Sequence, residues 1–399
     1  MTDSNERDNL AADLLVSDLM INKLTGSRML RRMSTTGVIQ SHRDLFRPGV
    51  DLSPAMLDEN LSDRDRQRIE TLTHLETDRD RYLKKAEECL RSGVRSVSWF
   101  DDHYPGAMKH LEGMPIILYF KGNTDYLKET GNSVAVVGSR KPSNYGLRAT
   151  AEIVRNLALQ GTIIVSGLAR GIDTAAHRAT LAAGGKTIAV TACGLDMVYP
   201  PENRDLFDEI AKEGLLVSEM PPGQEAVRRY FPARNRIMSA LSDAVAIMEA
   251  GEFSGTLHTA SFAVAQGRDV FVLPGSIYSS YCLGNLMLLR DGADILLCAD
   301  DILSRLAGSA FTREMDEIRA RLRHNEIREL LPDHPEKLSR EELSSLISDE
   351  LSNGDMTLDE LVASTGVSFS ILAPLLSEML ISGAVTENRE RFALTFPYR

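Results

Sequence analysis

From residue 133 onward, short apolar runs alternate with longer stretches in which apolar residues recur every three or four positions. Short runs of apolar, β-branched residues are typical of buried strands, and the longer period is typical of amphipathic helices. The predicted strands are 133–137, 162–165, 187–191, 215–218, 244–248, 269–273 and 294–297. The predicted helices are 145–160 and those that begin at Asp173, at Asn203, before Arg236 and at Thr256.

This order predicts an α/β fold, because strands that alternate with helices pair in parallel through right-handed crossovers. Such crossovers place helices on both faces of the sheet. We therefore expect an extended Rossmann-like parallel sheet over residues 96–305.

The pattern differs before this region. Residues 1–95 predict a small helical domain, in which Leu10, Leu14, Leu15 and Leu19 follow a helical period. The stretch 62–92 is highly charged and also helical in composition. It carries no catalytic signature, so we interpret residues 1–95 as a packing or interaction domain.

The pattern changes again after the sheet. Residues 306–345 are dense in charge and predict a linker or a solvated helix. Residues 346–399 predict a compact helix-turn-helix unit with a wing. Thr357 and Glu360 have the spacing of a capping box, a second helix follows from about Ser368, and strands are expected at 383–385 and 391–395.

Composition limits the class of protein. A chain of 399 residues is long enough for two or three domains, and 43% hydrophobic with 26% charged residues is typical of globular proteins. The amino-terminal segment is acidic and lacks the layout of a signal peptide, so we expect a cytoplasmic protein. The cysteines are scattered, which predicts reduced thiols and no zinc site: Cys89, Cys193, Cys282 and Cys298.

The net charge of −12 argues against a protein that coats nucleic acid with its whole surface. Most of that charge lies in residues 301–399, which carry 11 basic and 18 acidic side chains. The predicted sheet region is close to neutral, and its arginines concentrate in loops. A local basic edge can therefore still bind a polyanion.

Six segments that follow predicted strands are rich in Gly, Ser, Arg and Asn. They begin at Gly138, Ser166, Tyr199, Phe231, Ser254 and Pro274. The carboxyl ends of parallel strands share one sheet edge, where small residues let backbone amides approach a phosphate and arginines can pair with its oxygens. The predicted DNA-binding residues are Gly138, Ser139, Arg140, Ser166, Gly167, Arg170, Gly171, Phe231, Arg234, Asn235, Arg236, Ser254, Gly255, Thr256, Gly275 and Ser276.

Several of these residues also have structural interpretations. Asp173 can cap the helix that it begins, and His177 is more often a packed histidine than a ligand. Arg234 or Arg236 can pair with Glu219 or Glu249, and Ser254-Gly255-Thr256 can serve only as a helix cap. Lys186 precedes its strand and is expected at the opposite sheet edge.

The order and spacing of these motifs resemble the DNA-processing protein A family, DprA/Smf, over about residues 97–305. The resemblance begins with Tyr104-Pro105, Pro115 and Leu118-Tyr119 and continues through Gly194-Leu195-Asp196 and the loops above to Gly284 and Gly292-Ala293. It implies single-stranded DNA binding that protects incoming DNA and loads a RecA-type recombinase in natural transformation. It also implies a homodimer through the sheet domain, a sterile-alpha-motif-like (SAM-like) amino-terminal domain and a winged-helix tail.

Two positions depart from the family pattern. Leu286 stands where the family usually has an asparagine, with Asn285 one place earlier, which weakens the case for a contact from this loop. Pro201 stands where lysine is common, which removes a phosphate contact and implies weaker binding at that corner.

Two alternatives come from other classes of function. The sheet also resembles the Lonely-guy nucleotide phosphoribohydrolases, but Leu257, His258 and Thr259 stand where those enzymes carry acidic residues. A transcriptional regulator is disfavoured because the second helix of the tail has no Lys or Arg to meet duplex phosphates, so a protein contact or a packing role is expected for it. No nucleotide-binding Walker string occurs, and we expect a binder without catalysis, cofactor or metal.

Overall fold

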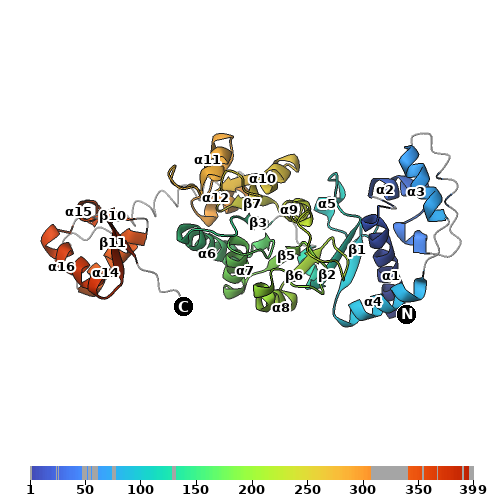
Figure 1. Cartoon of the computed structure of the whole chain (residues 1–399), viewed down its shortest axis with the longest axis horizontal. Coiled ribbons are helices and arrows are strands. Elements are labelled where there is room, and N and C mark those ends of the chain that lie inside the picture. The colour runs from blue at the N-terminus through green and yellow to red at the C-terminus, as the bar shows by residue number, and fades with distance from the viewer. Residues whose placement is uncertain are drawn as a thin grey trace. The chain divides into compact units, whose positions relative to one another are not determined.

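The computed structural model divides the chain into two compact units, Met1–Gly308 and Ser309–Arg399 (Figure 1). It describes all residues except 1, 24, 26, 47–51, 53–54, 56–61, 74–77, 128–131, 307–339, 353–354, 366, 389–390 and 395–399. Each unit is considered separately below.

The first unit is built around a nine-stranded sheet with the order β1-β2-β6-β5-β4-β3-β7-β8-β9. Its strands are β1 (Arg95–Ser98), β2 (Ile117–Gly122), β3 (Ser133–Val137), β4 (Ile163–Ser166), β5 (Thr187–Thr191), β6 (Leu215–Ser218), β7 (Ala244–Ile247), β8 (Asp269–Val272) and β9 (Asp294–Ile295). Strands β3 to β9 pair in parallel, which confirms the predicted sheet. Strands β1 and β2 were not predicted, and they extend the β6 edge in antiparallel pairing.

Helices cover both faces of this sheet. They are α5 (Gly106–Lys109), α6 (Asn144–Leu159), α7 (Ile172–Ala182), α8 (Arg204–Glu213), α9 (Tyr230–Ala240), α10 (Thr256–Ala265), α11 (Leu283–Arg290) and α12 (Ala299–Leu306). Alternate residues of β3 divide between two cores, because side chains along a strand point to opposite faces. Val134 and Val136 pack with α6, α7 and α12, whereas Ala135 and Val137 pack with α9 and α10.

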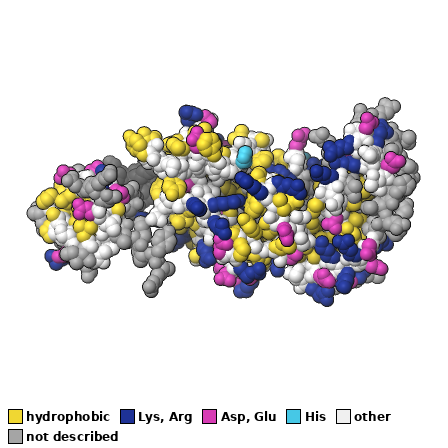
Figure 2. Space-filling view, in the orientation of Figure 1, with side chains coloured by type: hydrophobic (Ala, Val, Ile, Leu, Met, Phe, Trp, Pro, Cys, Tyr) yellow, Lys and Arg dark blue, Asp and Glu magenta, His cyan; other side chains and the backbone are white. Residues whose placement is uncertain are grey.

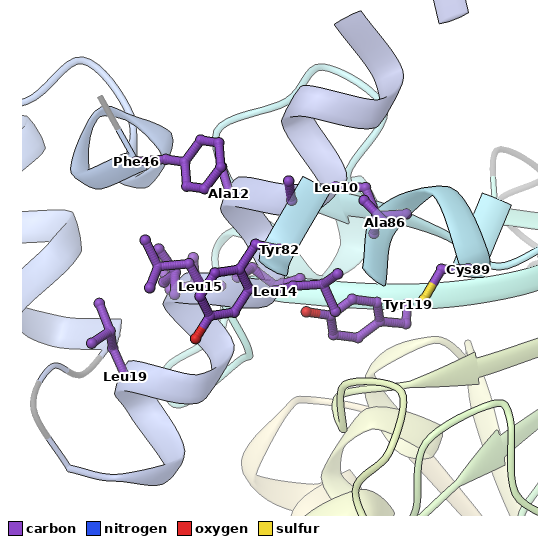
Figure 3. Close-up of a cluster of buried hydrophobic side chains, with 14 of the residues drawn as sticks. Leu10, Ala12, Leu14, Leu15, Leu19, Phe46, Tyr82, Ala86, Cys89 and Tyr119 are labelled. Atoms are coloured by element: carbon purple, nitrogen blue, oxygen red, sulfur yellow. The ribbon is translucent and has the colours of Figure 1, made fainter. Parts of the chain in front are cut away.

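The amino-terminal segment of this unit contains the helices α1 (Thr2–Ile21), α2 (Ser27–Thr35), α3 (Asp63–Thr73) and α4 (Arg79–Arg91) and the 3-10 helix η1 (His42–Phe46). Leu10, Leu14, Leu15 and Leu19 are buried, as their spacing predicts. Burial is not confined to one face of α1, because every residue from Leu10 to Ser17 is buried. Figure 3 shows these side chains packed against Tyr82, Ala86 and Cys89 of α4 and Tyr119 of β2, so one core joins helices and sheet.

Among its described residues, the second unit holds three helices and a small sheet of order β10-β12-β11. Its elements are α14 (Arg340–Ser352), β10 (Met356–Thr357), α15 (Leu358–Thr365), α16 (Phe369–Ile381), β11 (Val385–Asn388) and β12 (Arg391–Leu394). The capping box is confirmed: the Thr357 amide donates to the Glu360 carboxylate, and the Glu360 amide donates to the Thr357 hydroxyl. Most of the predicted linker lies outside the described residues, but α14 starts before residue 346, and Leu343 and Ile347 join the core of this unit.

Candidate nucleic-acid interface

The candidate site lies where the chain changes direction across the sheet. From β3 the chain adds β4, β5 and β6 on one side, and it then returns to add β7 on the other. Loops that leave β3 and β7 in opposite directions open a crevice at the carboxyl end of a doubly wound sheet, where ligands usually bind.

A pocket of about 850 Å³ occupies this crevice. It brings together the predicted residues Gly138, Ser139, Arg140, Phe231, Arg234, Asn235, Ser254, Gly255 and Thr256. Ser166, Gly167, Arg170, Gly171, Arg236, Gly275 and Ser276 do not line it. The first group comes from the loop after β3, from α9 and from the start of α10, so three separate segments converge on one cavity.

The segment from Phe231 to Arg236 is not a loop, as its composition had predicted, but the first two turns of α9. The amino end of a helix carries positive potential and free amides, so the start of α9 supports an anion site at this place better than a loop would. Phe231 contacts two neighbours. The Arg140 guanidinium lies 5.0 Å from its ring centre, and the Tyr199 ring meets it edge-on at 5.3 Å. An exposed arginine beside two aromatic rings can contact both a phosphate and a base.

Arg234 is placed differently from Arg140. Its side chain is only 5% exposed, and its guanidinium donates to the backbone oxygens of Gly167 and Val190 at the ends of β4 and β5. A Cβ at residue 167 would collide with this guanidinium, so the glycine leaves room for the arginine. Burial, followed by the charge of Arg140, lowers the pKa of Arg234, while Asp173 acts in the opposite direction. Arg234 thus connects α9 to the sheet, and Gly167 leaves the space that its guanidinium occupies.

Two other predicted arginines are paired within the protein. Nη2 of Arg236 lies 2.7 and 2.6 Å from the two carboxylate oxygens of Glu219. Arg236 thus forms an ion pair with Glu219, which was one of the structural interpretations of this residue. Arg170 is exposed and pairs with Glu202. Glu249 pairs with neither Arg234 nor Arg236. It is buried, and it accepts hydrogen bonds from the amide and hydroxyl of Ser143 at the start of α6.

Residues of the loop after β4 form hydrogen bonds with other groups of the protein. Asp173 does not take the capping position, which Gly171 occupies. Its carboxylate instead accepts a bond from the Ala169 amide at 3.3 Å. Burial raises the pKa of Asp173, although Arg234 opposes this effect. The Ser166 hydroxyl donates to Val136 inside the sheet. His177 is a packed residue, as expected, with Nδ1 2.7 Å from the Thr187 hydroxyl.

The loop after β8 lies beside the pocket but does not line it. Gly275 packs directly on Cys282, where a Cβ would collide with the sulfur. Ser276 is exposed, and its hydroxyl accepts from the Tyr278 amide at 3.2 Å. Asn285, one place before the family position, is fully buried and donates to the carbonyls of Met248 and Leu273. It therefore joins the ends of β7 and β8.

The sequence had not singled out several residues that line the pocket, among them Arg228, Met238 and Phe253. Arg228 and Phe253 are exposed, and the signal for Arg228 was its place three residues before Phe231. Figure 2 shows Lys and Arg side chains gathered across the middle of the sheet-bearing unit, near α9, with hydrophobic side chains over α10 and α11.

Within the part of the chain that the structure describes, no cluster of His, Cys, Asp or Glu has the geometry of a metal site. The helices described there are too short or too polar to cross a membrane.

Comparison with known proteins gives consistent results. A family model described as DNA recombination-mediator protein A matches residues 95–307. Protein Smf of Synechocystis is 42% identical over 222 residues, or 55% of this chain. The DNA processing protein DprA of Streptococcus pneumoniae is 44% identical over 209 residues, or 52% of this chain. The X-ray structure of DNA processing protein A from Streptococcus pneumoniae covers 65% of this chain and 95% of its own, with 35% identity and a TM-score of 0.52.

The matched region is only part of each relative. It spans 56% of the Synechocystis protein and 73% of the DprA from Streptococcus pneumoniae. The candidate pocket lies entirely within the residues that the family model matches.

Proposed function

Because this chain belongs to the DNA recombination-mediator protein A family, we propose that it binds single-stranded DNA without sequence preference through the pocket between β3 and β7. The observation that carries this proposal is the composition of that pocket. Exposed Arg140 and Arg228 lie in it beside Phe231 and Tyr199, over the amino end of α9. Arginines neutralise phosphates, and aromatic rings stack on bases of any sequence.

The proposal covers the wider role as well. The protein protects incoming single strands during natural transformation and passes them to a RecA-type recombinase, as a homodimer formed through the sheet-bearing unit, in the cytoplasm. The amino-terminal helices form the SAM-like part. The order of elements from residue 340 to residue 394, with helices followed by a wing of paired strands, supports a winged helix. In this proposal α16 makes a protein contact or packs, because its sequence contains no Lys or Arg.

The pocket supports binding rather than catalysis. The one carboxylate among its described lining residues is Asp173, which is buried and bound to the Ala169 amide. Glycosidic hydrolysis as in the Lonely-guy enzymes needs a carboxylate near the substrate, yet the residue after Thr256 is Leu257, which packs on the core. Incubation with labelled single strands, ATP and Mg²⁺ should therefore leave strand and nucleotide intact. Release of ribose 5-phosphate from a nucleoside monophosphate would support the hydrolase instead.

The test of the DNA site is Arg140→Ala. Removing one phosphate contact should weaken binding to all sequences alike and make the salt dependence shallower by about one counterion, as measured by anisotropy at several salt concentrations. The matched control is Arg170→Ala, because Arg170 is also exposed in a neighbouring loop but pairs with Glu202 outside the pocket. If Arg140→Ala leaves both affinity and salt slope unchanged, the pocket is not the DNA site.

A further inference from the structure

The chemistry of the pocket differs from that of the surface beside it. The exposed arginines Arg140 and Arg228 line the pocket, together with Phe253 of the loop after β7. The segment 270–289, which lies beside the pocket without lining it, contains no charged residue. A surface without cations offers little to a phosphate, so a base is the part of a nucleotide that suits it.

Exposed aromatic side chains occur on this uncharged segment and on the loops that contact it. Phe253 and Tyr278 are each 93% exposed, and Tyr145 and Tyr281 are about half-exposed. Groups of exposed aromatic side chains often mark interaction sites. These four rings come from three segments: the start of α6, the loop after β7 and the loop after β8.

Backbone contacts hold these three segments together. The Gly284 amide donates to the Ala250 carbonyl at 2.8 Å, and a Cβ at Gly251 would lie 3.3 Å from the Ser280 carbonyl. The Tyr145 hydroxyl donates to the Pro274 carbonyl at 2.9 Å. The aromatic rim, defined as Tyr145, Phe253, Tyr278 and Tyr281, is thus built on connected loops, and Phe253 belongs to both the rim and the pocket.

We propose that the aromatic rim is a stacking platform for unpaired bases of a nucleic-acid strand whose phosphates lie against Arg140 and Arg228. This inference rests on the proposed function and adds the site where the bases are held. Flat aromatic rings stack on every base, so the platform is tolerant of sequence. Base faces are covered in a duplex, so the platform selects single strands over double strands.

The experiment compares a single strand with an abasic strand of the same length, because the two carry the same phosphates and differ only in bases. The intact protein should bind the base-containing strand at least about fivefold more tightly, which corresponds to the lower end of measured stacking effects. The double variant Phe253→Ala/Tyr278→Ala should have a clearly smaller ratio, with Phe231 and Tyr199 still present, while keeping its affinity for the abasic strand and its salt slope. Tyr278→Phe should retain the ratio, since the ring remains.

The matched control is Phe369→Ala, because Phe369 is also an exposed aromatic residue (58%) but lies in the second unit. The inference is overturned if the double variant keeps the wild-type ratio, or if it loses affinity for both strands equally. Failure of the proposed function looks different: Arg140→Ala would then leave binding to both strands unchanged.

Discussion

At the scale of single residues, two arginines that look equivalent in the sequence have different environments in the structure. Arg234 and Arg140 both lie at the candidate pocket. The buried guanidinium of Arg234 donates hydrogen bonds to two backbone carbonyls, whereas the exposed guanidinium of Arg140 lies over the ring of Phe231. Sequence spacing cannot distinguish them, because the difference depends on which carbonyls the folded sheet brings beneath α9.

This difference predicts that the two arginines contribute unequally to stability. Arg234→Met should lower the free energy of unfolding by about 2–3 kcal/mol, because it leaves two buried carbonyls without donors. Arg140→Met should change it by less than about 0.5 kcal/mol, as is usual for exposed side chains. Chemical denaturation measures both. Equal stability of the two variants would show that the contacts of Arg234 contribute nothing.

His177 predicts a dependence of stability on pH. Burial, followed by the charge of Arg234, lowers the pKa of His177 to about 3. The unfolded chain binds a proton at this residue below about pH 6.5, whereas the folded chain stays neutral there. The free energy of unfolding should therefore decrease as the pH is lowered from about 6.5 to about 3, by up to about 1.4 kcal/mol per pH unit from this residue. His177→Gln should have a shallower slope across this window, and an unchanged slope would contradict the assignment.

At the scale of elements, a buried ion cluster joins α1, η1 and β1. The Asp13 carboxylate of α1 accepts from Arg43 at 2.9 Å and from Ser96 at 2.6 Å, and it lies 2.7 Å from His42. Burial alone would raise the pKa of Asp13, but His42 and Arg43 lower it to about 2. Arg43 also reaches Asp101 beyond β1, so the cluster connects the amino-terminal helices to the sheet edge.

Asp13→Asn should therefore destabilise the first unit by about 3 kcal/mol, because removal of one partner leaves buried charge uncompensated. Asp8→Asn is the matched control, since Asp8 lies in the same helix and its exposed carboxylate meets Arg7. Thermal denaturation of both variants at neutral pH provides the measurement. Similar melting temperatures for Asp13→Asn and the unmodified chain would show that the cluster does not stabilise the connection between the helices and the sheet.

The elements that sequence predicted best are those with a strong period. The seven parallel strands follow from apolar runs between helices, and the capping box follows from two residues at a fixed spacing. Strand β1 was missed because polar residues interrupt it, and the apolar run of β2 was taken only as part of the segment that leads into the sheet. Phe231 to Arg236 was misread because arginine and asparagine look like loop residues, while the helical period there is carried by buried Ile237 and Met238.

At the scale of the whole molecule, the two units differ in net charge and in fold. The candidate pocket and the aromatic rim both lie in the first unit, whereas the second contributes neither. Residues 340–399 carry 4 basic and 10 acidic side chains, so they repel rather than attract a polyanion. Each unit also has its own buried core, which is a condition for independent folding.

A chain that ends at Gly308 should therefore bind single-stranded DNA at least as tightly as the full chain, and equally tightly at high salt. The boundary matters, because a cut near residue 345 would divide α14, whose Leu343 and Ile347 are buried. Anisotropy titrations of both chains at the same salt concentrations supply the measurement, and circular dichroism with chemical denaturation checks that the shortened chain is folded. A somewhat higher affinity at low salt is also expected, because the acidic unit and its long-range repulsion are gone, and this difference should disappear as salt screens it. A folded chain that has lost most of its affinity would place part of the DNA site in residues 309–399.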